Sequence, residues 1–224
     1  MLSASTLGLM VECPRCFWLR LVKHVDRPSS PFPSLPGGID RIMKARFDAY
    51  RSRGELPEEL SAHGIDARLF GDGRLISIWR SNRAGLRTTD VKSGVTLMGA
   101  VDDILEKDGK LIVLDFKTRG YPKKEDTAGF YMDQLSIYNM LLRRNGYATS
   151  DYGYLLFLYP MDIVAGERIL FRTEVAKVGT DIKAAEELFA RAIALLAGGL
   201  PEPSPSCGFC SWARAYASAT GQRG

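Results

Sequence analysis

Apolar side chains recur with the 3.6-residue period of an amphipathic helix in several stretches of this chain. In residues 39–53 they share one face, and basic side chains lie between them, which predicts a basic helix able to face a phosphate backbone. The same spacing predicts helices over residues 128–145 and 180–197. Residues 3–25 are expected to form two helices joined by a turn.

Runs typical of β-strands alternate with these helices. We predict strands at residues 75–79, 96–105, 110–117, 152–159 and 167–178. The first three are expected to form an antiparallel sheet, because a Lys107-Asp-Gly turn joins the second to the third. The fourth is apolar nearly throughout, as buried strands are, so the sheet continues beyond the helix that Asn145-Gly146 ends.

Proline-rich stretches mark the boundaries of the pattern. Residues 27–38 predict an ordered surface loop, since proline lacks a backbone donor and fixes φ. A second stretch, rich in glycine, proline and serine, precedes the last cysteines. We expect one domain over residues 1–224. It consists of an N-terminal cysteine segment with its loop (1–36), a core (37–199) and a C-terminal cysteine tail (200–224).

Composition excludes some classes of protein without identifying a partner. The chain of 224 residues is 46% hydrophobic and 25% charged, which is ordinary for a globular protein and excludes fibrous or wholly disordered classes. Its net charge of +4 is compatible with a polyanionic partner. There is no run of about 18 apolar residues and no secretory signal pattern, so we expect no membrane span and a cytoplasmic location.

A charged pair ends the third predicted strand. Asp115 and Lys117 stand two residues apart, so they share a face with the apolar residues Leu111 and Val113. Burying such a pair costs desolvation, which a metal ion or a substrate phosphate would offset. The alternative is a solvated ion pair, which is how many Asp-x-Lys sequences occur.

Phosphodiester hydrolysis gives the charged pair a chemical role. A divalent cation needs hard oxygen ligands, which Asp102, Asp115 and the Phe116 carbonyl can supply. The cation, Mg²⁺ or Mn²⁺, would polarise the phosphate and activate a water, while Lys117 orients that water and stabilises developing charge. Gln134 and Tyr138 lie four residues apart on the next helix, on one face, and can line the site or be ordinary helix surface.

The order of these residues resembles the RecB-like PD-(D/E)XK nucleases. Gly99-Ala-Val-Asp102 is followed by Asp115-x-Lys117 and then by Gln134-x-x-x-Tyr138. The resemblance implies a restriction-endonuclease-like α/β fold, with a mixed β-sheet core flanked by helices, and DNA as the substrate. It also implies a Mg²⁺ or Mn²⁺ site at Asp102 and Asp115, with Lys117 as the catalytic lysine and Gln134 and Tyr138 beside them. Asp103 would project from the other face.

The chain departs from this family at the first core helix. Related nucleases commonly place a histidine or acidic metal ligand there, after a glycine. Gly37-Gly38 precedes this helix, but the helix has no histidine, and its acids are Asp40 and Asp48. Asp40 is the better candidate ligand. Its alternative role is that of a first-turn acid favoured by the helix dipole.

Four cysteines form two Cys-x-x-Cys pairs, Cys13 with Cys16 and Cys207 with Cys210. Each pair can place two thiolates on one metal centre, so a shared site would join the two ends of the chain. CRISPR-associated iron-sulfur exonucleases of the same family carry a 4Fe-4S cluster that joins their ends in this manner, usually with one cysteine plus three. The resemblance thus favours 4Fe-4S here. Zinc suits the two-plus-two spacing equally well, and free thiols or disulfides are the remaining alternative.

The sequence therefore predicts a metal-dependent DNA nuclease acting in repair, recombination or defence. A catalytically weak DNA-binding module, recruited by a helicase or an integrase, is the first alternative. A metal- or redox-sensing protein centred on the cysteines is the second.

Overall fold

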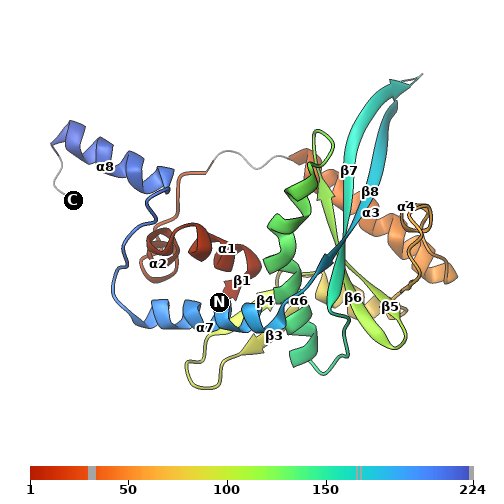
Figure 1. Cartoon of the computed structure of the whole chain (residues 1–224), viewed down its shortest axis with the longest axis horizontal. Helices are drawn as coiled ribbons and strands as arrows, with labels where there is room; N and C mark the ends of the chain where they lie inside the picture. The colour runs from red at the N-terminus through yellow and green to blue at the C-terminus, as the bar shows by residue number, and fades with distance from the viewer. Residues whose placement is uncertain (30–33, 165, 167, 222–224) are drawn as a thin grey trace.

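The computed structural model describes residues 1–29, 34–164, 166 and 168–221. Two sheets form its centre, and helices pack on both sides of the larger one (Figure 1). The three-stranded sheet has the order β1-β4-β3, and the five-stranded sheet has the order β2-β5-β6-β7-β8. The strands are β1 (Leu2–Ser3), β2 (Arg68–Leu69), β3 (Leu86–Thr89), β4 (Thr96–Gly99), β5 (Asp103–Lys107), β6 (Lys110–Thr118), β7 (Tyr152–Val164) and β8 (Arg168–Gly179).

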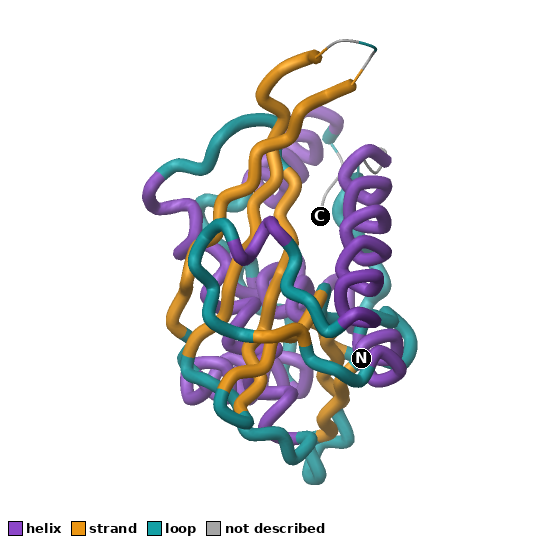
Figure 2. Tube along the Cα trace, turned by 90° about the vertical axis from the view of Figure 1, so that its right-hand side faces the viewer, coloured by secondary structure: helices purple, strands orange, loops and turns teal. Residues whose placement is uncertain are grey.

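The larger sheet is mixed, as the sequence predicts. Strands β5 and β6 form an antiparallel hairpin whose turn residues, Asp108 and Gly109, have φ angles of 50° and 73°. Positive φ at both positions is what a two-residue hairpin turn requires. Strand β7 returns parallel to β6 after a helix, and β8 pairs antiparallel with β7. The β7–β8 hairpin extends past the rest of the sheet (Figure 2).

Helices cover this sheet from both sides. They are α1 (Ala4–Glu12), α2 (Pro14–Val22), α3 (Ser34–Arg53), α4 (Glu58–Ser61), α5 (Gly73–Trp79), α6 (Met132–Arg144), α7 (Ile182–Ala197) and α8 (Gly208–Thr220), with a 3-10 segment η1 (Glu125–Tyr131) leading into α6. None of the helices in the described part of the chain combines the length and apolar character needed to cross a membrane.

Two hydrophobic cores follow from the alternation along β6. Leu111 and Val113 belong to the core that α1, α6 and α7 share, whereas Ile112, Leu114 and Phe116 belong to the core beneath α3. Both faces of the strand are buried, so its central part carries apolar residues without interruption. Because Asp115 and Lys117 follow Leu111 and Val113 in the alternation, they extend the face that α6 covers.

One predicted strand is a helix. The sequence pattern places a strand at residues 75–79, but these residues belong to α5. Asp72 caps the helix, since its side chain accepts a hydrogen bond of 2.9 Å from the Leu75 N–H. The apolar run is short, and short runs do not distinguish a strand from a buried helix. The Asp72 cap, which lies just before the apolar run, favours the helix over the strand.

A second prediction is wrong in its continuity. Residues 96–105 form two strands, β4 and β5, in different sheets. Between them the backbone leaves the ladder: the Val101 N–H donates to the Trp79 carbonyl at 3.1 Å, and Arg80 binds the Asp102 carbonyl at 2.7 Å. The sequence pattern predicts Asp102 within a strand, but Asp102 lies in the link between the two strands.

Helix α3 begins at Ser34, earlier than the predicted residue 39, so residues 34–38 are not loop. Pro36 fits because it lies in the first turn, where a backbone N–H has no partner within the helix. The remainder of the predicted loop is partly confirmed: residues 27–29 have no regular structure, and residues 30–33 lie outside the described residues.

We expect Gly99→Ala to destabilise the protein by about 1–3 kcal/mol through overpacking. A Cβ atom at this position would lie 2.7 Å from Leu141 Cδ1 and 2.8 Å from Tyr138 Cδ1, both within the core against α6. Denaturant unfolding measures the change. Gly8→Ala is the matched control, because nothing lies within 4 Å of its new methyl group, and it should be neutral or slightly stabilising. Equal stability of the two variants would contradict the packing argument.

Candidate functional site

Asp115 lies at the end of β6 and is 3% exposed. Its carboxylate forms an ion pair with Lys117, the next residue on the same face. The Lys117 ammonium also donates a hydrogen bond of 2.9 Å to Gln134 Oε1, and the Gln134 amide donates to the Tyr138 hydroxyl at 3.0 Å. The structure thus brings together four of the predicted residues on β6 and α6, and Lys117 is held from two sides.

Asp102 approaches this group from the link between β4 and β5. Its Oδ2 atom accepts a hydrogen bond of 2.8 Å from the Phe116 N–H, which fixes it beside the end of β6. The negative charge of Asp102 lies close enough to Asp115 to help raise the pKa of the Asp115 carboxyl. Two carboxylates, those of Asp102 and Asp115, therefore lie close together at the end of the sheet.

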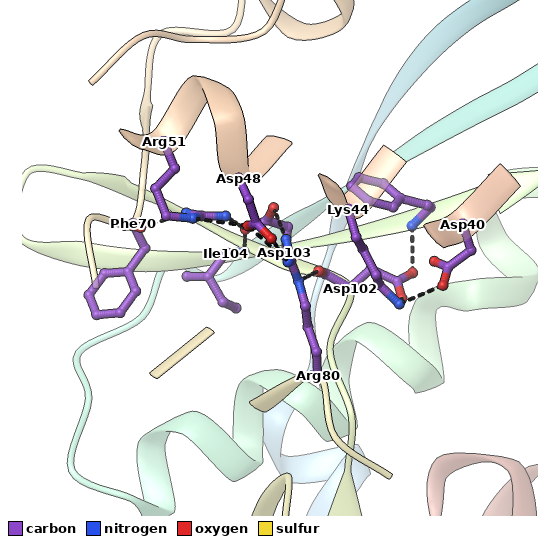
Figure 3. A network of polar contacts seen from close by, with 10 residues as sticks. Asp40, Lys44, Asp48, Arg51, Phe70, Arg80, Asp102, Asp103 and Ile104 are labelled. Carbon is purple, nitrogen blue, oxygen red and sulfur yellow. Dashed lines mark hydrogen bonds and ion pairs between the residues drawn. The ribbon is translucent and has the colours of Figure 1, made fainter. Parts of the chain in front are cut away.

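Asp103 points to the opposite side and is fully buried between two arginines (Figure 3). Its carboxylate oxygens lie 2.6 Å from Arg51 Nη2 and 2.8 Å from Arg80 Nη2. Burial raises the pKa of Asp103, and the two guanidinium charges counteract that rise. Arg80 also binds both oxygens of Asp48 on α3, at 2.9 and 2.7 Å. This network joins α3, α5 and the link that carries Asp102.

Lys44 and Arg80 are site residues that no motif in the sequence predicts. Lys44 lies one turn after Asp40 on α3, and its ammonium is 2.8 Å from Asp40 Oδ2 and 2.9 Å from Asp102 Oδ1 (Figure 3). The i,i+4 spacing to Asp40 is visible in the sequence and favours an ion pair on the helix. The contact with Asp102 is tertiary, so no sequence pattern indicates it.

A cavity of about 330 Å³ opens beside Asp102. Charged and polar groups line it from α3 and from the arginine network, and the link and the end of β6 complete it. Its lining includes Asp40, Lys44, Arg80, Asp102, Phe116 and Thr118. A cavity lined by carboxylates next to cations suits a ligand that carries both a phosphate and a metal ion.

Burial dominates the electrostatics of Asp115. It raises the pKa of this carboxyl to about 7, the charge of Asp102 adds to the rise, and Lys117 counteracts it. Burial likewise raises the pKa of Tyr138, so its hydroxyl stays protonated at neutral pH. Asp115 Oδ2 forms the ion pair with Lys117 but accepts no hydrogen bond of good geometry from the described residues.

These properties fit a divalent cation. A cation would give the buried Asp115 oxygen, which accepts no hydrogen bond from the described residues, a partner of opposite charge. It would also relieve the repulsion between Asp102 and Asp115. Phe116, the residue that follows Asp115, lines the cavity together with Asp102. Asp40 lies at the same cavity, where it is paired with Lys44.

The four cysteines form a second cluster, far from the first in the fold. Their sulfur atoms all lie within 4.8 Å of one another, and three pairs are closer: Cys13 with Cys210 at 3.8 Å, Cys16 with Cys207 at 3.7 Å and Cys16 with Cys210 at 3.6 Å. Cys16 and Cys210 lie in α2 and α8, and Cys13 and Cys207 are the residues just before these helices. Helix α8 stands apart from the rest of the molecule (Figure 1).

The surroundings of the cysteines are partly shielded from solvent. Cys13, Cys16 and Cys207 are buried. Burial raises the pKa of the Cys13 thiol, but hydrogen bonds with the backbone of Cys16 and Ser204 outweigh it and lower the pKa to about 6. Arg27 donates to Cys207 Sγ at 3.5 Å and stacks 4.6 Å from the Phe209 ring centre. A cluster of thiols beside a cation suits thiolate ligation of a metal.

Comparison with known proteins identifies the class. The sequence profile of the PD-(D/E)XK nuclease superfamily matches residues 1–215. The chain therefore belongs to the PD-(D/E)XK nuclease superfamily. It is also similar to a solved structure described as "Crystal structure of SSO0001", with 20% sequence identity, coverage of 87% of this chain and 75% of that chain, and a TM-score of 0.36. No curated protein matches the chain at a significant level.

We expect Asp115→Asn to change how stability depends on pH. The folded state holds the Asp115 proton up to a pKa of about 7, whereas the ordinary pKa of an unperturbed aspartate carboxyl is 3.8. The stability of the metal-free wild type should therefore fall as pH rises between these values, and the variant should lack this contribution to the fall. Melting temperatures measured in chelator at pH 5 and pH 8 test this. The melting temperature of the variant relative to that of the wild type should be higher at pH 8 than at pH 5.

Asp133→Asn is the control for this comparison, since it removes an exposed carboxylate from α6. Adding Mn²⁺ at pH 8 should raise the melting temperature of the wild type and of this control, but not that of Asp115→Asn. A difference between wild type and Asp115→Asn that is the same at both pH values would refute the assignment of the proton to Asp115.

Proposed function

We propose that this protein is a Mg²⁺- or Mn²⁺-dependent nuclease that hydrolyses phosphodiester bonds in DNA, with a RecB-like arrangement of site residues. The observation that carries the proposal is the buried Asp115 carboxylate, facing Asp102 and paired with Lys117. An arrangement so costly in desolvation is understandable where a metal ion and a phosphate bind. Membership of the nuclease superfamily supports the same reaction.

The residues divide the work as follows. Asp102, Asp115 and the Phe116 carbonyl would hold the metal ion, whose chemistry is to polarise the phosphate and lower the pKa of the attacking water. Lys117 orients that water and stabilises negative charge that develops on the phosphate. Gln134 binds the Lys117 ammonium, and Tyr138 binds the Gln134 amide, so the pair on α6 keeps Lys117 in position.

Cationic groups beside the cavity support a polyanionic substrate. Lys44 and Arg80 line it, and the chain has a net charge of +4. Guanidinium and ammonium groups bind phosphate oxygens through charge-assisted hydrogen bonds. Action in repair, recombination or defence, and cooperation with a helicase or an integrase, stay predictions from the sequence resemblance.

The decisive test is cleavage of single-stranded and duplex DNA in the presence of Mn²⁺. We expect the wild type to cleave at least one of these substrates, and chelator to stop the reaction. Asp115→Ala and Lys117→Ala should each lose on the order of 100-fold in rate or more, because each removes a group that acts on the transition state. Lys110→Ala removes the same charge from the exposed start of β6 and should leave the rate unchanged.

Retained DNA binding without metal-dependent cleavage would instead support the DNA-binding module. Lost cleavage in the Lys110→Ala control would show that charge on the strand, and not the site, governs the rate. Binding is to be compared at fixed salt, since phosphate contacts make affinity strongly salt-dependent.

We also propose that the four cysteines bind a structural zinc ion that joins the two ends of the chain. Zn–S bonds of about 2.3 Å in a tetrahedron place the sulfur atoms about 3.8 Å apart. The three short sulfur distances, from 3.6 to 3.8 Å, match this value. In a 4Fe-4S cluster each thiolate binds a different iron, so the sulfur atoms lie farther apart. The spacing thus favours the zinc alternative, in the reducing cytoplasm that the sequence predicts.

Metal analysis and visible absorbance test the cysteine proposal. We expect a colourless protein with one zinc per chain, and Cys16→Ser and Cys207→Ser should lose the zinc and melt at a lower temperature. Ser211→Ala, next to Cys210, is the matched control and should keep both. A brown protein containing iron and acid-labile sulfide would establish the cluster instead, and a metal-free protein with full stability would rule out both metals.

A further inference from the structure

Lys44 occupies a position between two carboxylates that come from different elements. Its ammonium is 2.8 Å from Asp40 Oδ2 on α3 and 2.9 Å from Asp102 Oδ1 on the link. The side chains of all three are partly shielded, with 23% exposure for Lys44, 38% for Asp40 and 19% for Asp102. This is a bridge across the site and not an ordinary pair on a helix surface.

The remaining contacts of Asp102 hold the bridge in place. Its Oδ2 atom is fixed by the Phe116 N–H at 2.8 Å, and its carbonyl by Arg80 at 2.7 Å. The Lys44 ammonium thus lies where carboxylate oxygens from α3 and from the link converge.

A divalent ion bound by both Asp40 and Asp102 would need the space that the Lys44 ammonium fills. The two cations would also repel each other at contact distance in a partly desolvated site. Asp40 and Asp102 can therefore share either Lys44 or a metal ion, but not both. Lys44 does not fill the position between Asp102 and Asp115, because it contacts Asp102 through Oδ1, whereas the Oδ2 atom of Asp102 lies against the Phe116 N–H.

We propose that Lys44 is a built-in cation that fills the position between Asp40 and Asp102, so that the site holds one divalent ion, bound through Asp102 and Asp115. Asp40 then positions Lys44 and is not a metal ligand. The inference rests on the proposed metal-dependent function and specifies how many ions that function uses. It also gives a physical account of the missing histidine on α3, since a lysine supplies positive charge at that corner without a metal.

The balance of charge supports a single ion. Three carboxylates, Asp40, Asp102 and Asp115, face two ammonium groups, Lys44 and Lys117, which leaves one formal negative charge. One divalent ion turns this into one positive charge, which a single phosphate of the substrate neutralises. Two ions would leave three positive charges in a partly buried site, and such an excess is costly.

Mn²⁺ binding to Lys44→Met tests the proposal without any reaction. Methionine keeps the length of the stem and removes the charge. By titration calorimetry and the spin-resonance signal of free Mn²⁺ at pH 8, we expect one ion per wild-type chain. Lys44→Met should bind a second ion, or bind the first more tightly by on the order of tenfold. Arg41→Met removes one charge from the exposed side of the same helix and should bind like the wild type.

Asp40→Asn separates the two roles of Asp40. If Asp40 only positions Lys44, this variant still binds one ion, whereas loss of the ion would show that Asp40 is a ligand and overturn the proposal. Unchanged stoichiometry and affinity in Lys44→Met would overturn it as well. Lys44→Gln repeats the measurement with a polar side chain should the methionine variant fail to fold.

The same binding measurements give a different result if the proposed metal-dependent function is wrong. If the wild type binds no Mn²⁺, or if Asp115→Ala binds it as tightly as the wild type, the proposed metal site itself is wrong. One ion in the wild type, lost in Asp115→Ala and unaffected by Lys44→Met, would leave the metal site standing and refute only the role of Lys44.

Discussion

The fully buried carboxylate of Asp103, held between Arg51 and Arg80, fixes the geometry on which the site depends. A buried charge is tolerated only when it is paired and hydrogen-bonded, and here two guanidinium groups from α3 and α5 do both. Because Arg80 also holds the Asp102 carbonyl and Asp48, the link between β4 and β5 cannot shift independently of α3. The neighbouring aspartates thus serve the site differently: Asp103 anchors the backbone that aims Asp102 at Asp115.

The site assembles where the two hydrophobic cores meet the end of β6. Lys117 is held on the α6 side, through Gln134 and Tyr138, whose core also packs against Gly99. Lys44 arrives from α3, whose core lies on the other face of the sheet. Groups from both faces reach the same pair of carboxylates only at the strand end, where the sheet no longer separates them. Displacing α6 would therefore release Lys117 from Gln134, whereas displacing α3 would move Lys44 and disturb the link that carries Asp102.

Much of this arrangement follows from local sequence. Strand alternation predicts that Asp115 and Lys117 share a face, and the helical period predicts the same for Gln134 and Tyr138. The break at Asp102 is not visible, since it depends on contacts with Trp79 and Arg80, which lie about twenty residues earlier. The bridge of Lys44 to Asp102 is hidden for the same reason. Patterns along one element report its faces, but the partner across a gap is decided by tertiary packing.

The pairing of the two ends through the cysteines bears on how the molecule is made. Cys16 and Cys207 are 191 positions apart, so the first half of the ligand set emerges from the ribosome long before the second. Strand β1 can pair with β4 once residue 98 has been synthesised. Helices α1 and α2, which follow β1, can therefore take their positions early in synthesis. In the proposed zinc site, these first two thiols would supply only half of the ligands until the second pair has been synthesised. Binding of the proposed ion would therefore require a chain translated at least as far as residue 210.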